Sequence, residues 1–177
     1  MGRSRYKIYE KRYPYFMTSS VVGWVPVFDI HEVARMILDG FMFLQKERQV
    51  AIYAYVIMKD HIHFIASGEN LSKKVRLFKS YTAREIIDYL KKTAKQDLLQ
   101  SFVVKDSISN RSEYQFWQNG FHPKQIVGDK MMLQKIEYIH KNPVIAGYVD
   151  DMLKWEYSSI CNYLDQETCL EITCFRR

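Results

Sequence analysis

The sequence predicts one domain of the α+β class, and three observations support this expectation. Apolar and β-branched residues gather in short runs that are typical of strands, at 13–22 and within 51–67. Three longer stretches repeat apolar residues every three or four positions, which is typical of helices with one buried face. The order along the chain is strand, helix, two strands, helix, a short extended stretch and a last helix. This order is compatible with an α+β fold but does not dictate a topology.

Length and composition favour a single globular domain over residues 1–177. Hydrophobic residues make up 47% of the chain and aromatic residues 15%, which favours a packed core and excludes a disordered protein. A basic N-terminal arm of about residues 1–12 and a C-terminal extension of about residues 150–177 flank the central part. The three cysteines lie in that extension, and their odd number favours free thiols in a reducing compartment.

The net charge of +6 suggests a polyanionic partner, although a soluble basic protein without such a partner would have the same composition. The start of the chain lacks the pattern of a secretory signal, and no apolar run is long enough to span a bilayer. We therefore expect a cytoplasmic protein that has no membrane partner.

The first helix is predicted to begin at Asp29, because Asp29 and Glu32 have the spacing of a capping box. Its apolar residues follow the spacing of one buried face: Ile30, Val33, Ala34, Ile37, Leu38, Phe41 and Met42. We expect this helix to end near Arg48 and to serve as scaffold.

Residues 51–67 are predicted to form two strands, one at 52–58 and one that begins at His61. Side chains alternate along a strand, so His61 and His63 share a face and can aim at one divalent metal ion or phosphate. The motif alone is weak, because such pairs are more often hydrogen-bonded histidines without a ligand. A metal ion would also need a third ligand from elsewhere in the chain.

The second helix is predicted from an N-cap at Ser72 to about Thr93. Its inner side is predicted to contain Leu71, Val75, Phe78, Thr82, Ile86 and Leu90. Many of its other residues are basic, among them Lys73, Lys74, Arg76, Lys79 and Arg84. This basic surface is either a solvated face or a surface that contacts phosphates.

Residues 116–127 are predicted to be extended, and the last helix is predicted at 129–141. Its apolar stripe is expected to contain Met132, Leu133, Ile136 and Ile139. Tyr138 lies away from the centre of that stripe, and Asn142 lies one turn further on. Because Asn142 precedes Pro143, we expect it to end the helix.

Four motifs then resemble a known family: YVIMKDHIHFIAS, WQNGFHP, EYIHKNPVIAGYV and WEYSSICNYL, at 55–67, 117–123, 137–149 and 155–164. In this order and spacing they resemble HUH single-tyrosine transposases, of the IS200-like superfamily, and within it the REP-associated tyrosine transposases. The resemblance extends from about Tyr13 to Leu164.

This resemblance implies a ferredoxin- or RRM-like antiparallel sheet, with the histidines on a central strand and helices on the opposite face (the HUH endonuclease fold). It implies that His61, His63 and Asn142 bind Mg²⁺ or Mn²⁺ and that Tyr138 is the nucleophile. The tyrosine helix is expected to lie beside the metal site.

The implied activity is metal-dependent cleavage and transfer of single-stranded DNA near hairpins, through a covalent 5′-phosphotyrosine. We expect DNA contacts from Lys73, Lys74, Arg76, Lys79, Arg84, Arg3, Arg5 and Trp117, association with the bacterial nucleoid when DNA is bound, and a monomer or loose homodimer. The alternative is a DNA hairpin-binding regulator that no longer transposes. A two-histidine phosphoesterase lacks its second motif here, and relaxases usually have longer chains.

Overall fold

The computed structural model describes residues 13–104 and 113–176. The predicted arm of residues 1–12, with Arg3 and Arg5, lies outside these described residues. The elements are β1 (Tyr15–Ser20), η1 (Val22–Trp24), η2 (Val27–Asp29), α1 (His31–Arg48), β2 (Ala51–Ile57), β3 (His61–Ser67), α2 (Leu71–Lys92), α3 (Gln96–Gln100), β4 (Lys124–Gln125), α4 (Asp129–Ile145), η3 (Met152–Lys154) and α5 (Ile160–Tyr163). Within the described ranges, no helix combines the length and the apolarity needed to cross a membrane.

The strands form one four-stranded antiparallel sheet in the order β2-β3-β1-β4. The strand that begins at His61 is therefore central, with β2 on one side and β1 on the other. This arrangement confirms the α+β class and the expected antiparallel sheet, and it fixes the histidines away from the sheet edges.

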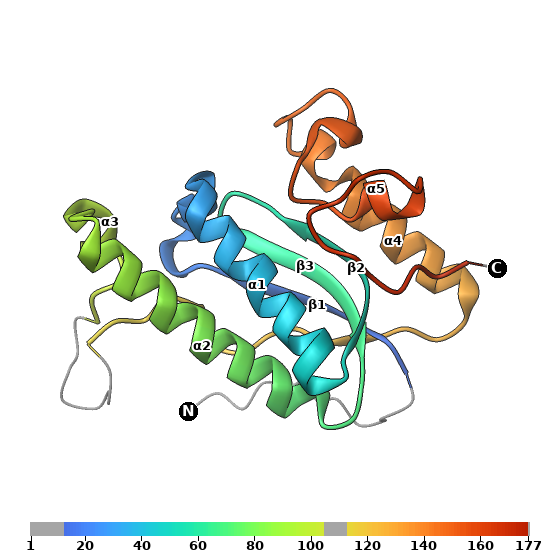
Figure 1. Ribbon diagram of the computed structural model, residues 1–177, viewed down its shortest axis with the longest axis horizontal. Helices are drawn as coiled ribbons and strands as arrows, with labels where there is room; N and C mark the ends of the chain where they lie inside the picture. Colours follow the sequence, from blue (N-terminus) through green and yellow to red (C-terminus); the bar gives the residue numbers. More distant parts are fainter. Residues whose placement is uncertain (1–12, 105–112, 177) are drawn as a thin grey trace.

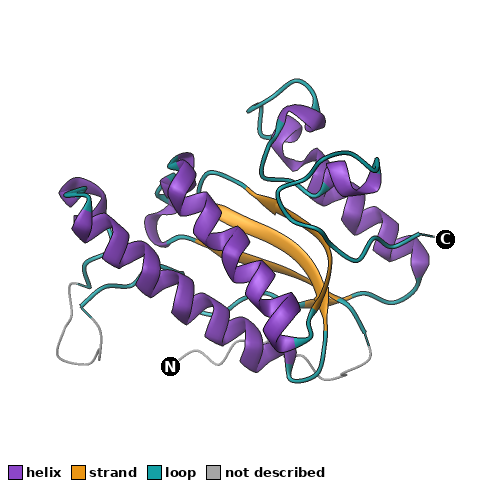
Figure 2. Ribbon diagram, viewed as in Figure 1, coloured by secondary structure: helices purple, strands orange, loops and turns teal. Residues whose placement is uncertain are grey.

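The two faces of the sheet are covered by different helices (Figures 1 and 2). Ile62 and Phe64 of β3 face the larger hydrophobic core, to which α1 and α2 contribute their buried sides. Ile65 faces a smaller core that contains Met132, Ile136 and Ile139 of α4. The sheet thus separates the scaffold helices from the helix that carries Tyr138.

The inner side of α2 is buried at all six predicted positions. Helix α1 packs beside it, and Gly40 of α1 lies against Phe78 and Thr82 of α2. A Cβ atom at Gly40 would lie only 2.7 Å from Cε2 of Phe78, so the absence of a side chain allows the two helices to meet.

Two predicted helix starts are wrong. Helix α1 begins at His31 with Ile30 as its N-cap, and Asp29 lies in the preceding η2 turn, so the capping box does not form. Asn70, not Ser72, precedes α2. In each case the chain enters the helix through a turn that the local pattern does not reveal.

Helix α4 continues through Pro143 to Ile145, so Asn142 does not end it. The carbonyl of Asn142 still accepts a hydrogen bond from the Ala146 amide, at 2.9 Å. Proline lacks one amide but can occupy a final helical turn when the neighbouring bonds are kept. Leu133, which was predicted in the apolar stripe, is exposed, whereas the other three stripe residues are buried.

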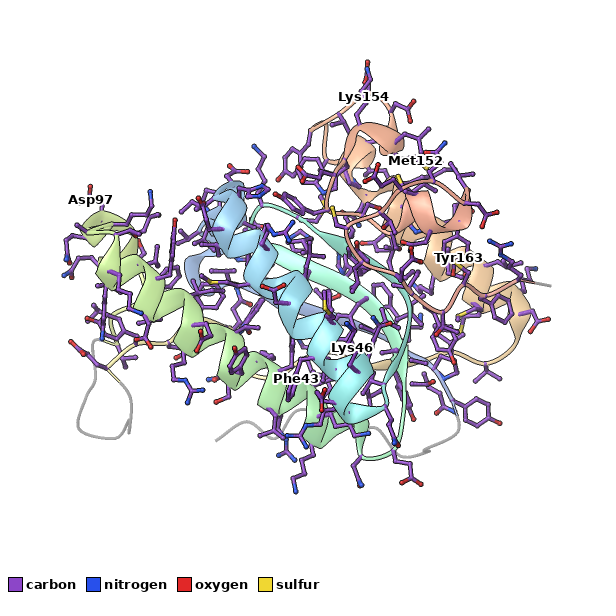
Figure 3. All side chains as sticks on the ribbon, in the orientation of Figure 1. Phe43, Lys46, Asp97, Met152, Lys154 and Tyr163 are labelled. Carbon is purple, nitrogen blue, oxygen red and sulfur yellow. The ribbon has the colours of Figure 1, made fainter. Side chains whose placement is uncertain are left out.

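The C-terminal extension packs along the outer edge of β2, where it forms backbone hydrogen bonds. The Ile57 amide donates to Tyr157 (2.9 Å), the Ser159 amide donates to Tyr55 (3.0 Å) and the Thr173 amide donates to Ile52 (2.9 Å). Figure 3 labels Tyr163 within this segment; its hydroxyl donates to the Tyr53 carbonyl at 2.7 Å. The extension also contains all three cysteines, none in a disulfide.

Candidate functional site

The two histidines are held side by side by the pairing of β1 with β3. His63 lies opposite Thr18 and His61 lies opposite Ser20. The alternation of side chains places both imidazoles on the α4 side of the sheet, with their ring centroids 4.8 Å apart. The predicted common face for these two residues is therefore confirmed.

Both imidazoles use the same ring nitrogen for a hydrogen bond within the protein. Nδ1 of His61 lies 2.5 Å from Oδ1 of Asp60, and Nδ1 of His63 lies 2.7 Å from Oγ1 of Thr18. A carboxylate only accepts, so a neutral His61 would carry its proton on Nδ1 and leave a lone pair on Nε2. His63 has the same arrangement when its Nδ1–H donates to Thr18. Such outer hydrogen bonds are typical of histidines that bind metal through the other nitrogen.

The environment of His63 favours its neutral form. Burial lowers the pKa of His63 to about 3, and the neighbouring charges of His61 and Lys135 add to this decrease. The imidazole therefore stays uncharged across the physiological range, as a metal ligand must.

Helix α4 brings Tyr138 to this pair. The Tyr138 ring centroid lies 5.5 Å from that of His63, and Tyr138 is 41% exposed. Phe16 of β1 lies beside both groups: its ring stacks on His63 at 5.4 Å and meets Tyr138 edge-on at 5.8 Å. Tyr138, which the hydrophobic pattern left unexplained, faces the histidines.

Asn142 lies one turn beyond Tyr138 on α4 and is half-buried. The helix runs towards the β2–β3 turn, since Nζ of Lys59 in that turn lies 4.9 Å from the ring centroid of Tyr148, just past α4. Asn142 is thus displaced from Tyr138 towards the His61 end of the pair. Over 13–104 and 113–176, His, Cys, Asp and Glu nowhere form a group of three suited to a metal ion.

A lysine side chain also lies at the site. Nζ of Lys135 lies 4.8 Å from the ring centroid of Phe16 and 5.2 Å from that of Tyr138. The sequence reasoning missed Lys135, Phe16 and Thr18. Lys135 is one turn before Tyr138, which is a usable signal, whereas the strand pairing that brings Phe16 and Thr18 to His63 is not readable from local sequence.

The basic residues of α2 are not part of this cluster. Helix α2 packs on the opposite face of the sheet from the histidines. Lys73, Arg76 and Arg84 are exposed, as expected for phosphate contacts. Lys74 is half-buried, and its ammonium group donates to the Arg48 carbonyl.

Two of the predicted DNA contacts have structural roles instead. The ammonium group of Lys79 donates to the carbonyl oxygens of Gln118, at 3.0 Å, and Gly120, so it fixes the loop after residue 117. Trp117 is only 5% exposed, and its indole N–H donates to Oγ1 of Thr82 at 3.2 Å. The prediction that Trp117 contacts DNA is therefore wrong: the indole belongs to the core because α2 covers it.

Comparisons with known proteins show which proteins this chain is similar to. A Haemophilus influenzae protein described as a REP-associated tyrosine transposase is 27% identical over 113 residues, which cover 60% of this chain. The matched part covers 56% of that relative's length. The fold is similar to the solved structure of a REP-associated tyrosine transposase bound to a REP hairpin, with a TM-score of 0.68. That comparison covers 100% of this chain and 98% of the other at 17% identity, so the likeness is one of fold.

The family model for IS200-like transposases matches residues 25–142, which include both histidines, Tyr138 and Asn142. This match extends over more than half of the sequence. The chain therefore belongs to the IS200-like transposase family.

Proposed function

We propose that the protein cleaves and transfers single-stranded DNA beside hairpins, in a metal-dependent reaction with Tyr138 as the nucleophile. One observation carries the proposal: the exposed phenol of Tyr138 lies 5.5 Å, between ring centroids, from His63, whose neighbour His61 completes a paired-histidine site. Membership of the IS200-like transposase family supports it.

The donor set suits Mg²⁺ or Mn²⁺. His61 and His63 would offer Nε2, and Asn142 would offer its amide oxygen; these three groups are neutral, so the charge of the ion would stay available for a phosphate. Imidazole ligands shift the preference towards Mn²⁺. When bound, the ion would polarise the scissile phosphate and stabilise charge on the leaving oxygen.

In the proposed step, Oη of Tyr138 attacks the phosphorus atom and the bond from phosphorus to the 3′-oxygen breaks. The phenol loses its proton to solvent, and the departing 3′-oxygen takes a proton from solvent. The products are a 5′-phosphotyrosine and a free 3′-hydroxyl. Because the phosphodiester is conserved in the covalent intermediate, a 3′-hydroxyl of another strand can displace Tyr138 without ATP.

Hairpin DNA is the proposed partner for two reasons. The solved relative is bound to a REP hairpin, and this chain has a net charge of +6, which favours a polyanion. Arg76 and Arg84 are free of the constraints that hold Lys79, and they offer exposed positive charge on α2. Phosphate contacts there would position a duplex stem, while the cleaved strand reaches Tyr138.

The test uses labelled single-stranded oligonucleotides with the hairpins that flank the gene, in Mn²⁺, in Mg²⁺ and in EDTA. We expect a metal-dependent protein–DNA adduct that survives SDS. Tyr138→Phe should form no adduct and still bind DNA, because only the hydroxyl is lost. Tyr81→Phe, which removes the hydroxyl of an exposed tyrosine on α2, is the matched control and should form the adduct normally.

An adduct with Tyr138→Phe would show that another residue is the nucleophile. Hairpin binding by the wild-type protein without any adduct would favour a regulator that binds DNA without cleaving it.

A further inference from the structure

Trp24 lies beside the histidine pair with its indole exposed. It is 56% exposed, more than any other aromatic side chain in residues 13–104 and 113–176. Its ring centroid lies 6.1 Å from that of His61, at an interplanar angle of 79°. The indoles of the other two tryptophans are not available in this way. Trp117 is buried in the core, and the indole N–H of Trp155 donates to the Ile57 carbonyl.

The backbone of Trp24 has an unusual conformation. Its φ is 55°, in the left-handed region, and the φ of the preceding Gly23 is 68°. Bulky residues rarely adopt positive φ, and such strain persists only where the surroundings enforce it, often at functional sites. Here the fully buried Val21 anchors the turn: its amide donates to the Asp60 carbonyl at 2.8 Å, and its carbonyl accepts from the Trp24 amide at 3.2 Å.

Trp24 and Tyr138 lie at opposite ends of the histidine pair. Along β1, Phe16 contacts Tyr138, Thr18 lies opposite His63 and Ser20 lies opposite His61. The chain then enters the η1 turn, which ends at Trp24. A phosphate held at the histidines would therefore have the phenol on one side and the indole on the other.

We propose that Trp24 is a stacking platform for the DNA base whose nucleotide carries the leaving 3′-oxygen. In an in-line displacement, the attacking and leaving oxygens lie on opposite sides of the phosphorus atom. With Tyr138 at the His63 end, the 3′-oxygen departs towards the His61 end, where Trp24 lies. The assignment of the stacked base to the leaving side of the phosphate rests on the proposed function. The stacking of a base on Trp24 does not.

This platform has a consequence for strand transfer. The nucleotide that stacks on Trp24 keeps its new 3′-hydroxyl next to the phosphotyrosine, so the cleaved strand can rejoin. Stacking on an aromatic face tolerates any base, so Trp24 contributes retention of the 3′-end without reading its sequence.

The first experiment measures binding of oligothymidine of about 16 nucleotides, a length within the known range of single-strand sites, in EDTA. We expect Trp24→Ala to weaken binding by about 5- to 150-fold and Trp24→Phe to restore most of the affinity. Phe43→Ala is the matched control, because Phe43 is an exposed aromatic of α1 on the other face of the sheet, and it should bind as wild type (Figure 3). Equal affinities for wild type and Trp24→Ala would overturn the proposal.

The second experiment tests on which side of the cleaved phosphate the base that stacks on Trp24 lies. Once the cleaved phosphate is mapped, the base on its 5′ side or its 3′ side is replaced by an abasic site, and single-turnover adduct formation is measured. We expect the 5′ abasic site to abolish the difference between wild type and Trp24→Ala, and the 3′ abasic site to leave it unchanged. The reverse pattern, or an equal effect at both positions, would overturn the assignment to the leaving nucleotide.

Failure of the proposed function is distinguishable from failure of this inference. A wild-type protein that forms no adduct would remove the cleavage activity, whereas the oligothymidine titration would still decide whether Trp24 stacks on DNA.

Discussion

Oγ1 of Thr18 lies 2.7 Å from Nδ1 of His63, and the two residues face each other across the paired strands β1 and β3. This hydrogen bond sets the rotation of the imidazole, so β1 controls which way Nε2 of His63 points. The orientation of a proposed metal ligand thus depends on a residue 45 positions earlier in the chain.

Thr18→Val keeps the shape of the side chain but removes this partner of His63. We expect metal affinity to fall about 10- to 100-fold, the range typical for loss of an outer hydrogen bond to a ligating histidine. The measurement is Mn²⁺ titration of adduct formation, with direct Mn²⁺ binding by electron paramagnetic resonance. Thr93→Val, which removes a threonine hydroxyl at the end of α2, is the control and should leave the titration unchanged. Identical Mn²⁺ curves for all three proteins would show that Thr18 does not orient the ligand.

Lys79 and Arg76 are both cations of α2, but we expect opposite effects of their loss. Lys79→Ala removes the donor to two loop carbonyls and should reduce the free energy of unfolding by about 1–3 kcal/mol. Arg76→Ala, at an exposed position, should leave stability within about 0.5 kcal/mol but weaken DNA binding. It should also reduce the slope of log affinity against log salt by about 0.9, the value for one phosphate contact on a duplex stem.

Urea unfolding and DNA titrations at several salt concentrations separate these effects. A stable Lys79→Ala protein with a reduced salt slope would reverse our assignment of its role.

Gly40→Ala tests the contact between α1 and α2. Alanine favours a helix by about 1 kcal/mol over glycine, but its Cβ would lie 2.7 Å and 2.9 Å from Cε2 and Cδ2 of Phe78. That ring is stacked on Phe41 at 5.1 Å and cannot easily withdraw. Overpacking should dominate and lower stability by about 1–2 kcal/mol in urea unfolding. Asp39→Ala, at an exposed position next in the helix, should change stability by less than about 0.5 kcal/mol, and a stabilised Gly40→Ala would contradict the close approach.

We expect His140 to reduce the free energy of unfolding in acid. The side chain is buried, with Nε2 2.9 Å from Oγ of Ser159 and its ring against Tyr163, and burial lowers the pKa of His140 to about 4. In the unfolded chain the pKa is about 6.5, so the unfolded state takes up the proton first as the pH falls. The contribution of neutral His140 is therefore complete above about pH 6.5 and is lost towards pH 4, on the order of 3 kcal/mol in total.

Urea unfolding in EDTA at several pH values between about 7.5 and 4 would measure this dependence. His140→Gln should lose less stability than wild type over that range, whereas His63 titrates in both proteins and cancels from the comparison. Parallel curves for the two proteins would show that His140 does not contribute.

The parts of the fold that local sequence predicted are those set by side-chain alternation and helical period. His61 and His63 do share a face, because residues two apart on a strand always do. The inner side of α2 is buried at every predicted position, because apolar residues that recur every 3.6 positions lie on a single face of a helix. Tyr138 could be singled out because it lies away from the centre of the apolar stripe on its own helix.

The missed features depend on contacts between distant segments. Trp117 has the sequence context of a surface aromatic, but α2 packs over it and Thr82 takes up its N–H. Phe16 and Trp24 reach the histidines only because β1 pairs with β3 in one register, and a shift of a single residue would turn Phe16 to the other face. The positive φ of Trp24 is imposed by tertiary anchoring, so no local pattern predicts it.

The C-terminal segment that lies along β2 also covers one edge of the sheet. While Tyr157, Ser159 and Thr173 occupy the backbone groups of this strand, a second copy cannot add a strand there. Proteolytic clipping before Tyr157 would expose a row of unpaired amides and carbonyls, the kind of edge that recruits other chains into aggregates. The C-terminal segment therefore protects this edge of the sheet, and a truncated protein should aggregate more readily than the intact one.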